Sequence, residues 1–291
     1  MKELLGKPVA EALSGQLRAR LNELNEAHQR MPRLDVVVVG HNPASMAYVG
    51  RIQRACDKYG FDNKVHHFQD DVQEQQLLYS IDLLNHDEAV DGIIIQMPLP
   101  KGISQDALTA ALDPVKDVDV FHPANLGKIM MGTANIFPAT PHAVIELLRY
   151  YKIPTQGKHA VILGRSRIVG LPLANMLIQK QDPGDCTVTV CHSRTNDLPA
   201  VLRSADILVV AMGKPLFVKE DMVKEGATVI DVGINSVPDP ASPNGHKIVG
   251  DVDFERVAPR CQYISPVPGG VGPVTNMMLL YHTLQSRESR K

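Results

Sequence analysis

The sequence predicts an α/β fold made of two domains. Short β-branched runs such as "RLDVVVVG" and "DGIIIQMP" alternate with amphipathic helical stretches, which is typical of a parallel sheet covered by helices on both faces. The chain has 291 residues and exceeds the usual size of one compact core. A polar, turn-rich segment from Asp113 to Pro141 separates two such α/β series. We therefore expect one domain over residues 1–140, completed by the last helix over 273–291, and a second over 141–272.

The first series begins with a helix over residues 8–30, in which apolar residues recur on one face, and continues into the strand of "RLDVVVVG". Helices over 43–59 and 73–85 flank a short strand near 63–68, and "VDGIIIQMPLP" supplies another buried strand. These elements predict a three-layer α/β domain.

The second series begins after the connecting helix "HAVIELLRYYKI". Four strand-like runs follow, "HAVILG", "CTVTVCHS", "ADILVVAMG" and "GATVIDVG", separated by helical or turn segments. This order predicts a Rossmann-type domain. A last helix over about 273–287 follows the glycine-rich "PVPGGVGP" and could return to the first domain.

Composition narrows the class of partner. A net charge of −2 without a basic stripe argues against a nucleic-acid partner, and a small molecule is favoured. Four cysteines without a CxxC pair and eleven histidines without HExxH spacing predict neither a disulfide framework nor a metal site. The N-terminus is charged throughout and no segment is long and apolar enough to span a membrane, so we expect a cytoplasmic protein with reduced thiols.

The turn in "HAVILGRSRIVGLP" is the first candidate binding site. A strand followed by a tight turn and a helix start exposes backbone N–H groups that suit a pyrophosphate. The spacing of Gly164, Ser166 and Gly170 departs from GxGxxG by one residue and by a serine. An ordinary strand-to-helix turn remains the alternative at this point.

The next strand ends in "CHSRT", where a dinucleotide fold usually selects its coenzyme. An acidic residue there binds the ribose diol of NAD, whereas an arginine accommodates the additional phosphate of NADP. Ser193 and Arg194 stand at the strand end, Arg165 lies in the preceding turn, and the nearest acid is Asp197. The pattern favours NADP, with a solvated surface arginine as the alternative.

Two further segments carry candidate polar groups. "DPVKDVDVFHPANLG" brings Lys116, Asp117 and Asp119 into a stretch that we expect to be too polar and turn-prone for the core. A carboxylate beside apolar neighbours can accept two hydrogen bonds from the amino edge of a heterocycle, although turn or helix-cap aspartates are common. Gln96 ends a predicted parallel strand, where ligands of such sheets bind.

Taken together, these segments resemble the bifunctional methylenetetrahydrofolate dehydrogenase/cyclohydrolases. The resemblance runs nearly end to end, through "VGHNPASMAYV", "DGIIIQMPLP", "KDVDVFHPANLG", "PATP", "GRSRIVGLP", "CHSRT", "VAMGKP", "VIDVGIN", "VGDV" and "PVPGGVGPVT". It implies a homodimer of two-domain chains that bind tetrahydrofolate derivatives in a cleft between the domains and NADP on the second domain.

The resemblance also assigns residues. It implies catalytic or folate-binding roles for Tyr48, which would stack on the folate, for Asp119, which would hold the pterin edge, and for Gln96. The substrate site would be completed by Ile52, Pro266, Pro268, Gly269 and Gly270. The coenzyme would be surrounded by Gly164, Arg165, Ser166, Ser193, Arg194, Ile234 and Thr275.

The chain departs from the family pattern at three places. Family members carry a lysine four residues after the tyrosine, in a YxxxK pattern, and here that position is Ile52. The glycine usual after the pterin-binding aspartate is Val120, and "PCTPxG" reads "PATPHA", with Ala139 and His142. A glycine after Asp119 would suit a positive φ or close ligand approach, which a β-branched residue adopts poorly.

These departures predict different fates for the two family reactions. Hydride transfer to the coenzyme mainly requires positioning. Hydrolysis of the methenyl cation requires proton transfer, which isoleucine cannot provide and for which Arg51, always protonated, is a poor acceptor. We expect an NADP-dependent methylenetetrahydrofolate dehydrogenase of one-carbon metabolism in which the cyclohydrolase step is weak or lost.

Three alternatives remain open from the sequence. The enzyme could be fully bifunctional, with His142 or an ordered water in the lysine's role. The altered site positions could instead mark a non-catalytic folate- or NADP-binding protein. Finally, a dehydrogenase acting on another one-carbon or amine substrate fits the same fold.

Overall fold

The computed structural model describes residues 1–242 and 245–290 and divides into two compact units. Unit 1 comprises residues 1–11 and 140–275, and unit 2 comprises residues 12–139 and those from Asn276 onward. Residues 1–11, expected with the first domain, belong instead to unit 1, because β1 (Lys2–Glu3) pairs in parallel with β11 (Tyr263–Ile264). The assignment of a folate site and a coenzyme site to separate domain ranges stays a prediction.

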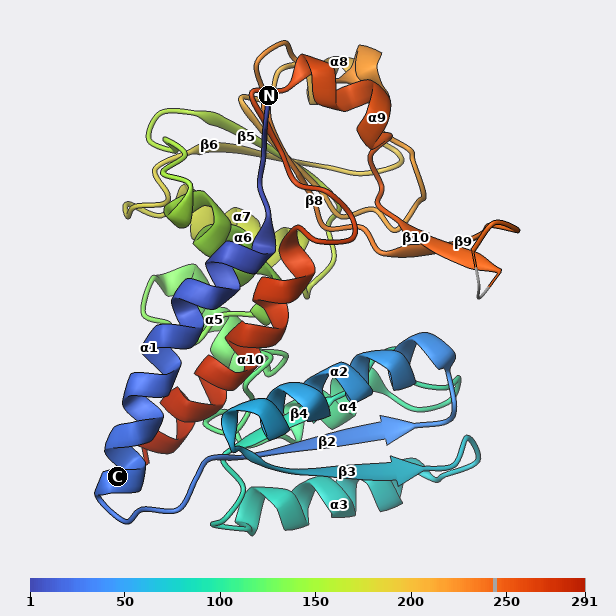
Figure 1. Ribbon diagram of the computed structural model, residues 1–291. Coiled ribbons are helices and arrows are strands. Elements are labelled where there is room, and N and C mark those ends of the chain that lie inside the picture. Colours follow the sequence, from blue (N-terminus) through green and yellow to red (C-terminus); the bar gives the residue numbers. More distant parts are fainter. Residues whose placement is uncertain (243–244, 291) are drawn as a thin grey trace. The chain divides into compact units, whose positions relative to one another are not determined.

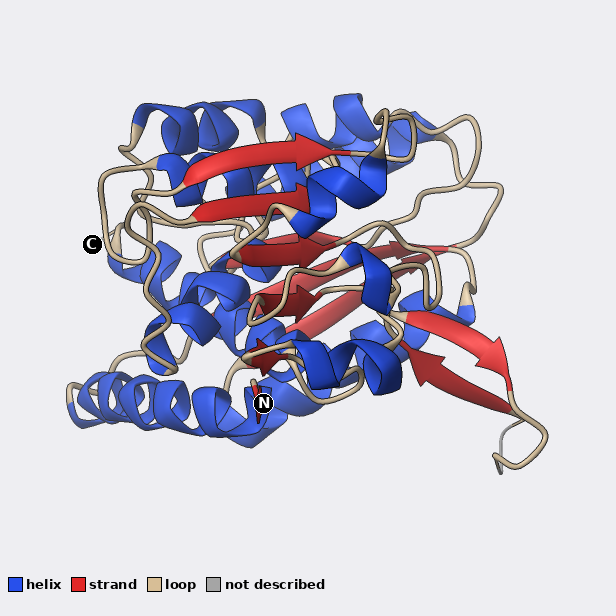
Figure 2. Ribbon diagram, turned by 90° about the horizontal axis from the view of Figure 1, so that it is seen from above, coloured by secondary structure: helices blue, strands red, loops and turns tan. Residues whose placement is uncertain are grey.

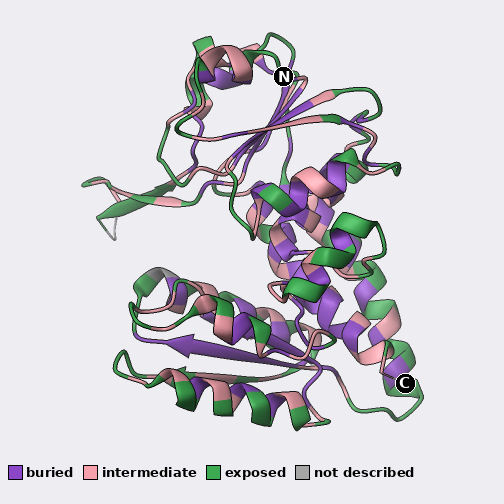
Figure 3. Ribbon diagram, turned by 180° about the vertical axis from the view of Figure 1, so that it is seen from behind, coloured by how far each residue is buried: buried purple, intermediate pink, exposed green. Residues whose placement is uncertain are grey.

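Unit 2 is built on a three-stranded parallel sheet in the order β3–β2–β4. Its strands are β2 (Arg33–Val39), β3 (Asp62–Phe68) and β4 (Gly92–Ile95). Helices α2 (Pro43–Tyr59) and α3 (Glu74–His86) lie on opposite sides of this sheet (Figure 1). The central strand β2 is almost entirely buried (Figure 3), as its unbroken apolar run predicts.

The remaining helices of unit 2 are α4 (Gln105–Ala110), α5 (Pro123–Met131) and most of α1 (Gly6–Glu26) and α10 (Val271–Glu288). The first helix ends at Glu26, earlier than expected, since His28 adopts a left-handed conformation with φ of 53°. Helix α5 was not predicted from the sequence. Pro123 and the left-handed Gly132 are turn-forming residue types, and here they begin and end a helix that His122 caps.

Unit 1 is built on a six-stranded parallel sheet in the order β1–β11–β8–β7–β5–β6. Its inner strands are β5 (His159–Leu163), β6 (Thr187–Cys191), β7 (Ile207–Val210) and β8 (Thr228–Asp231). The strand order reverses at β5, which pairs with β6 on one side and β7 on the other. Doubly wound sheets bind their ligands at the carboxyl ends of the strands beside such a reversal.

Unit 1 also contains the α-helices α6 (Ala139–Tyr150), α7 (Gly170–Ile178), α8 (Leu198–Arg203) and α9 (Phe254–Val257) and the short 3₁₀ helices η1 (Glu220–Met222) and η2 (Ala258–Arg260). Strands β9 (Asn235–Pro238) and β10 (His246–Val249) form a separate antiparallel ribbon (Figure 2). The prediction of a two-domain α/β fold with a Rossmann-type parallel sheet is thus confirmed.

Within residues 1–242 and 245–290, no helix has the length and apolar character needed to cross a membrane. The same described residues contain no group of three or more histidine, cysteine, aspartate or glutamate side chains suited to a metal ion. All four cysteines are buried free thiols.

Candidate active site

Helix α2 presents Tyr48 and the residue one turn later on the same face. Asn42 caps the helix by accepting a hydrogen bond from the Ser45 amide at 3.1 Å, and Pro43 occupies its first position. Tyr48 is half-buried, and Ile52, at the position where the resemblance predicts a lysine, is only 2% exposed. The exposed Arg51 guanidinium carbon lies 5.5 Å from the centroid of the Tyr48 ring. The face therefore offers an aromatic ring, an aliphatic wall and one permanent cation.

Asp119 is electrostatically coupled to Tyr48. Burial and the Asp119 charge raise the pKa of the Tyr48 hydroxyl well above its usual range, opposed by Arg51. Burial, with the neighbouring Asp117 charge, raises the pKa of the Asp119 carboxyl to about 7. The Ala139 amide donates one long hydrogen bond to Asp119 Oδ1, at 3.4 Å. This carboxyl retains acceptor capacity for a ligand donor.

The expectation that residues 116–119 are too polar for the core is wrong for Lys116 and Asp117, which are 3% and 1% exposed. Lys116 Nζ donates to the carbonyls of Leu84, Asn85 and Asp87 at 2.6–2.9 Å, closing the end of α3. Asp117 accepts hydrogen bonds that hold the start of α5, from the amides of Phe121 and His122 and from Asn125 Nδ2. Both buried charges are engaged in structural contacts.

Val120 keeps the backbone conformation that a glycine would adopt. Its φ is 59°, in the left-handed region that a β-branched residue rarely occupies, and its side chain is fully buried. A valine at this position was expected to adopt such a conformation poorly. The left-handed conformation is nevertheless present at Val120, with the backbone strain that it imposes on a β-branched residue.

Gln96 follows directly after β4, at the carboxyl end of the strand. Its Nε2 donates to the Met97 carbonyl at 2.6 Å, while its buried Oε1 lacks a hydrogen-bond partner among the described residues. Ser45 Oγ at the start of α2 donates to the same Met97 carbonyl at 3.3 Å, which brings α2 and this strand end together. An orphaned acceptor beside the Tyr48 helix is the kind of group that a ligand donor satisfies.

In unit 1, the turn after β5 has the features of a phosphate-binding turn. Gly164 has φ of 134°, and a Cβ there would lie 2.2 Å from the Ala211 carbonyl oxygen. Ser166 Oγ accepts hydrogen bonds from the amides of Val169 and Gly170, at 3.1 and 3.4 Å, at the start of α7. Arg165 and Ser166 are exposed. Hydrogen bonds within the turn thus fix its conformation, while its exposed residues remain accessible to a ligand.

At the end of β6, Ser193 and Arg194 are both exposed. The Arg194 amide donates to His192 Nδ1 at 3.1 Å, which holds the short loop. Asp197, the nearest acid in sequence, caps α8 by accepting from the Ala200 amide at 3.4 Å. The arginine is thus free to meet a phosphate, whereas the acid is engaged in a helix cap.

The remaining predicted residues also lie in unit 1. Ile234, just after β8, is 64% exposed, whereas Thr275 is buried and its hydroxyl donates to the Val271 carbonyl at 3.4 Å inside α10. Pro266, Pro268, Gly269 and Gly270 follow β11, and the Gly269 carbonyl accepts from the Gly6 amide at 2.8 Å. The structure thus groups Tyr48, Ile52, Gln96 and Asp119 in unit 2 and the other predicted residues in unit 1.

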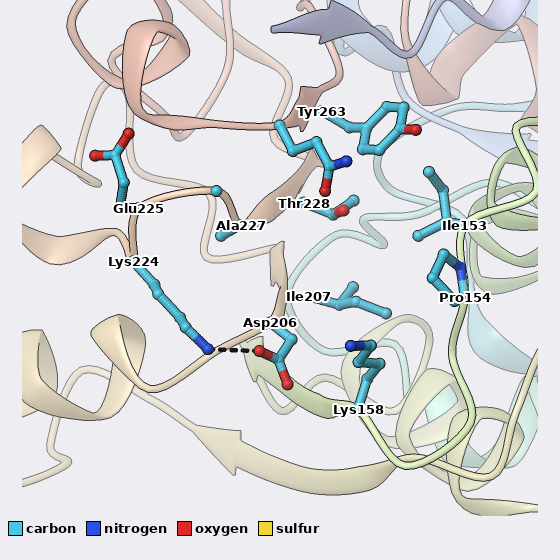
Figure 4. A pocket seen from close by; sticks show the side chains of 12 residues that line it. Ile153, Pro154, Lys158, Asp206, Ile207, Lys224, Glu225, Ala227, Thr228 and Tyr263 are labelled. Carbon is cyan, nitrogen blue, oxygen red and sulfur yellow. Dashed lines mark hydrogen bonds and ion pairs between the residues drawn. The ribbon is translucent and has the colours of Figure 1, made fainter.

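A pocket of about 160 Å³ lies at the opposite edge of the unit 1 sheet, beside the amino ends of β5, β7, β8 and β11 (Figure 4). Among its lining residues, Lys224 Nζ is paired with Asp206 at 2.6 Å. Parallel sheets bind ligands at their carboxyl edge, so this pocket is not the expected coenzyme site.

Comparison with known proteins agrees with this geometry. Residues 4–119 match the catalytic domain of the tetrahydrofolate dehydrogenase/cyclohydrolases, and residues 138–291 match their NAD(P)-binding domain. The chain belongs to the tetrahydrofolate dehydrogenase/cyclohydrolase family. It is 48% identical over 283 residues to the bifunctional protein FolD of Porphyromonas gingivalis, covering 97% of this chain and 96% of the relative.

Solved structures of this family share the fold closely. The FolD methylenetetrahydrofolate dehydrogenase/cyclohydrolase of Campylobacter jejuni is 42% identical with a TM-score of 0.92, covering 100% of both chains. The Trypanosoma brucei enzyme, solved in complex with NADP cofactor and inhibitor, is 38% identical with a TM-score of 0.92, covering 98% of this chain and 97% of that one. The prediction of family membership is confirmed, and the matched NAD(P)-binding domain agrees with the predicted nicotinamide dinucleotide coenzyme.

Proposed function

We propose that this member of the family oxidises methylenetetrahydrofolate to methenyltetrahydrofolate with NADP and that its cyclohydrolase step is weak or lost. The observation that carries the proposal is Ile52. One turn after Tyr48, where the family pattern has lysine, stands an aliphatic side chain that is 2% exposed. Loss of general acid–base help typically costs about 10²- to 10⁴-fold in rate.

The residues of unit 2 suit binding and orientation of a folate. Tyr48 offers a half-buried ring for stacking, and Ile52 continues the apolar wall. Asp119 can accept hydrogen bonds from the amino edge of a pterin, and the orphaned Gln96 Oε1 can accept another. None of these roles requires the missing lysine, so the groups that position the substrate for oxidation are retained.

The residues of unit 1 suit NADP. Backbone amides of the Gly164–Ser166 turn would hold the pyrophosphate, and Ser193 with Arg194 would meet the additional phosphate. When bound, the coenzyme supplies a hydride acceptor. Ile234 and Thr275 would lie around it, and the PVPGG residues Pro266, Pro268, Gly269 and Gly270 would line the substrate side.

The test is a time course with methylenetetrahydrofolate and NADP that follows reduced coenzyme and methenyl product separately, in a buffer where spontaneous hydrolysis is slow. Reduced coenzyme with persistent methenyl product is the expected result. Rapid methenyl loss would overturn the claim of a weak cyclohydrolase, and absence of reduction would overturn the dehydrogenase itself.

A second candidate is a fully bifunctional enzyme in which another group replaces the lysine. The observation in its favour is Asp119, a carboxyl with pKa raised to about 7 by burial and electrostatically coupled to Tyr48. His142 is a weaker substitute, since its Nε2 lies 3.6 Å from Glu146 Oε1. A methenyl hydrolysis rate that follows one titration near pH 7 and vanishes in Asp119→Asn would support this candidate.

We further propose a cytoplasmic homodimer without a nucleic-acid partner, as the family resemblance and the charge balance imply. Sedimentation of the purified chain tests the dimer. A single species with the mass of a monomer would contradict it.

A further inference from the structure

Two aspartates of unit 1 that the sequence analysis left without a role are among its most buried charged residues. Asp231, the last residue of β8, is 3% exposed, and Asp251 is 0% exposed. Asp231 Oδ1 accepts from the amides of Gly233 and Asp251 at 2.9 and 3.0 Å, and its Oδ2 accepts from the Val252 amide at 2.9 Å. Asp231 thus fixes the backbone from which Asp251 projects.

Asp251 in turn holds two loops at the carboxyl edge of the sheet. Its Oδ2 accepts from the amides of Met212 and Gly213, at 2.7 and 2.8 Å, in the loop that follows β7. Its Oδ1 accepts from Asn235 Nδ2 at 2.8 Å, at the start of β9 and next to the exposed Ile234. One carboxylate therefore joins the loop after β7 to the segment after β8.

Glycines allow the close approach of this pair. A Cβ on Gly233 would lie 2.3 Å from Asp251 Cγ, and a Cβ on Gly250 would lie 1.8 Å from Asp231 Oδ2. No side chain fits at either position without moving a carboxylate. The "VIDVG" and "VGDV" segments thus form an interlocked pair of segments.

This interlocked pair of segments adjoins the phosphate-binding turn. Gly164 packs against the carbonyl of Ala211, where a Cβ would stand only 2.2 Å away, and the Ala211 amide donates to the Leu163 carbonyl at 2.8 Å. Ala211 directly precedes Met212, the amide held by Asp251. Movement of the loop after β7 would therefore disturb the turn expected to bind pyrophosphate.

We propose that Asp251 is a positioning residue for the NADP reaction: by holding the loops after β7 and β8, its carboxylate sets the backbone on which the coenzyme binds. The inference rests on the proposed function in placing NADP at this edge of the sheet. Asparagine at position 251 has one acceptor oxygen in place of two. Either the two backbone amides lose their acceptor, or Asn235 must rotate its side-chain amide and give up its contact with the Val249 carbonyl.

The test compares Asp251→Asn with Asp206→Asn in the full chain, using calorimetric titration with NADP and steady-state KM values. Asp206 is partly exposed and accepts from the His159 amide and from Lys224 at the opposite edge of the same sheet, so its variant removes a hydrogen-bonded carboxylate away from the coenzyme. In Asp251→Asn, Kd and KM for NADP should rise about 10- to 100-fold. In the same variant, KM for methylenetetrahydrofolate should change less than about twofold.

Asp206→Asn should leave both KM values near wild type, whatever it does to thermal stability. Equal NADP affinity in the two variants, or parallel changes of both KM values in Asp251→Asn, would overturn the inference. Failure of the wild-type chain to bind NADP would instead overturn the proposed function. If Asp251→Asn does not fold, the same measurements are made on Asn235→Ala. This variant removes the hydrogen bond between Asp251 and the segment after β8, and it should raise the Kd for NADP about two- to tenfold. An unchanged Kd would refute the positioning role of Asp251.

Discussion

The proposed coenzyme region of unit 1 and the proposed folate region of unit 2 satisfy their buried polar groups in different ways. Asp231 and Asp251 each accept three hydrogen bonds from the chain itself. Asp119 accepts one long hydrogen bond, and Gln96 Oε1 has no partner among the described residues. The first region offers a fixed backbone to its ligand, whereas the second offers side chains whose partners must come from the ligand.

Of the departures from the expected family pattern, Ile52, Val120 and Ala139 lie in unit 2 and His142 lies in unit 1. Recognition through backbone amides depends on glycines and buried carboxylates, and nearly any change there meets a neighbouring atom. Recognition through separate side chains would allow one side chain to change while the others continue to bind the ligand. The predictions below alter each region separately.

The largest effect is expected from Ile52→Lys, which would restore the side chain missing from the folate region. We expect methenyl hydrolysis, measured as loss of methenyl absorbance, to become about 10²- to 10⁴-fold faster, because a largely desolvated lysine can exchange protons with the substrate. Ile52→Met, an aliphatic control of similar volume, should leave hydrolysis unchanged. Equal rates in the two variants would show that position 52 does not limit the reaction.

A smaller effect is expected from Arg194→Ala in the coenzyme region. Loss of a charge-assisted contact to the additional phosphate should lower kcat/KM for NADP about tenfold or more and leave the value for NAD unchanged. Arg203, exposed and bonded to the Asp221 carbonyl at 2.8 Å, supplies the control Arg203→Ala, which should change neither value. If kcat/KM falls by the same factor for NADP and for NAD in Arg194→Ala, the arginine does not select the coenzyme.

Asp119 gives a pH-dependent difference in stability. Burial raises the pKa of its carboxyl from 3.8 to about 7, so the folded protein retains a proton that the unfolded chain releases. Stability is therefore lost as pH rises from about 4 to about 7. Asp119→Asn removes this pH-dependent loss of stability. The Tm of the variant minus the Tm of wild type should therefore be larger at pH 8 than at pH 4. Each kcal/mol of stability difference corresponds to roughly 2–4 °C in Tm.

The comparison of the two Tm values requires ligand-free protein, because bound folate would favour the ionised carboxylate. A constant Tm difference across this pH range would show that Asp119 titrates normally.

The smallest effect concerns Val120. Its left-handed φ costs a residue with a Cβ about 1–2 kcal/mol, so Val120→Gly should be more stable than Val120→Ala by roughly 1 kcal/mol. Both variants lose the two buried γ-methyl groups of valine, and they differ only in the Cβ; at an ordinary position glycine would be the less stable of the two. Urea unfolding measures the difference. The dehydrogenase rate of Val120→Gly should stay within about twofold of wild type, since the backbone conformation is already present.

Much of the fold could be predicted from the sequence because its signals are local. The β-branched runs of β2, β5 and β7 predicted the buried parallel strands, and α2 begins at the Pro43 expected to open it. Helix α5 was missed because Pro123 and Gly132 indicate a turn as readily as the two ends of a helix.

The sequence by itself determined the identity of the groups available for chemistry: an isoleucine where the family pattern has lysine, and arginine rather than an acid after β6. Only the tertiary structure decided which charges do structural work. Lys116 is buried because the end of α3, 29 to 32 residues earlier in the chain, supplies its hydrogen-bond acceptors, and Asp251 meets Met212 across 39 residues of chain. Such pairings depend on where the sheet places its strand ends, which no local pattern encodes.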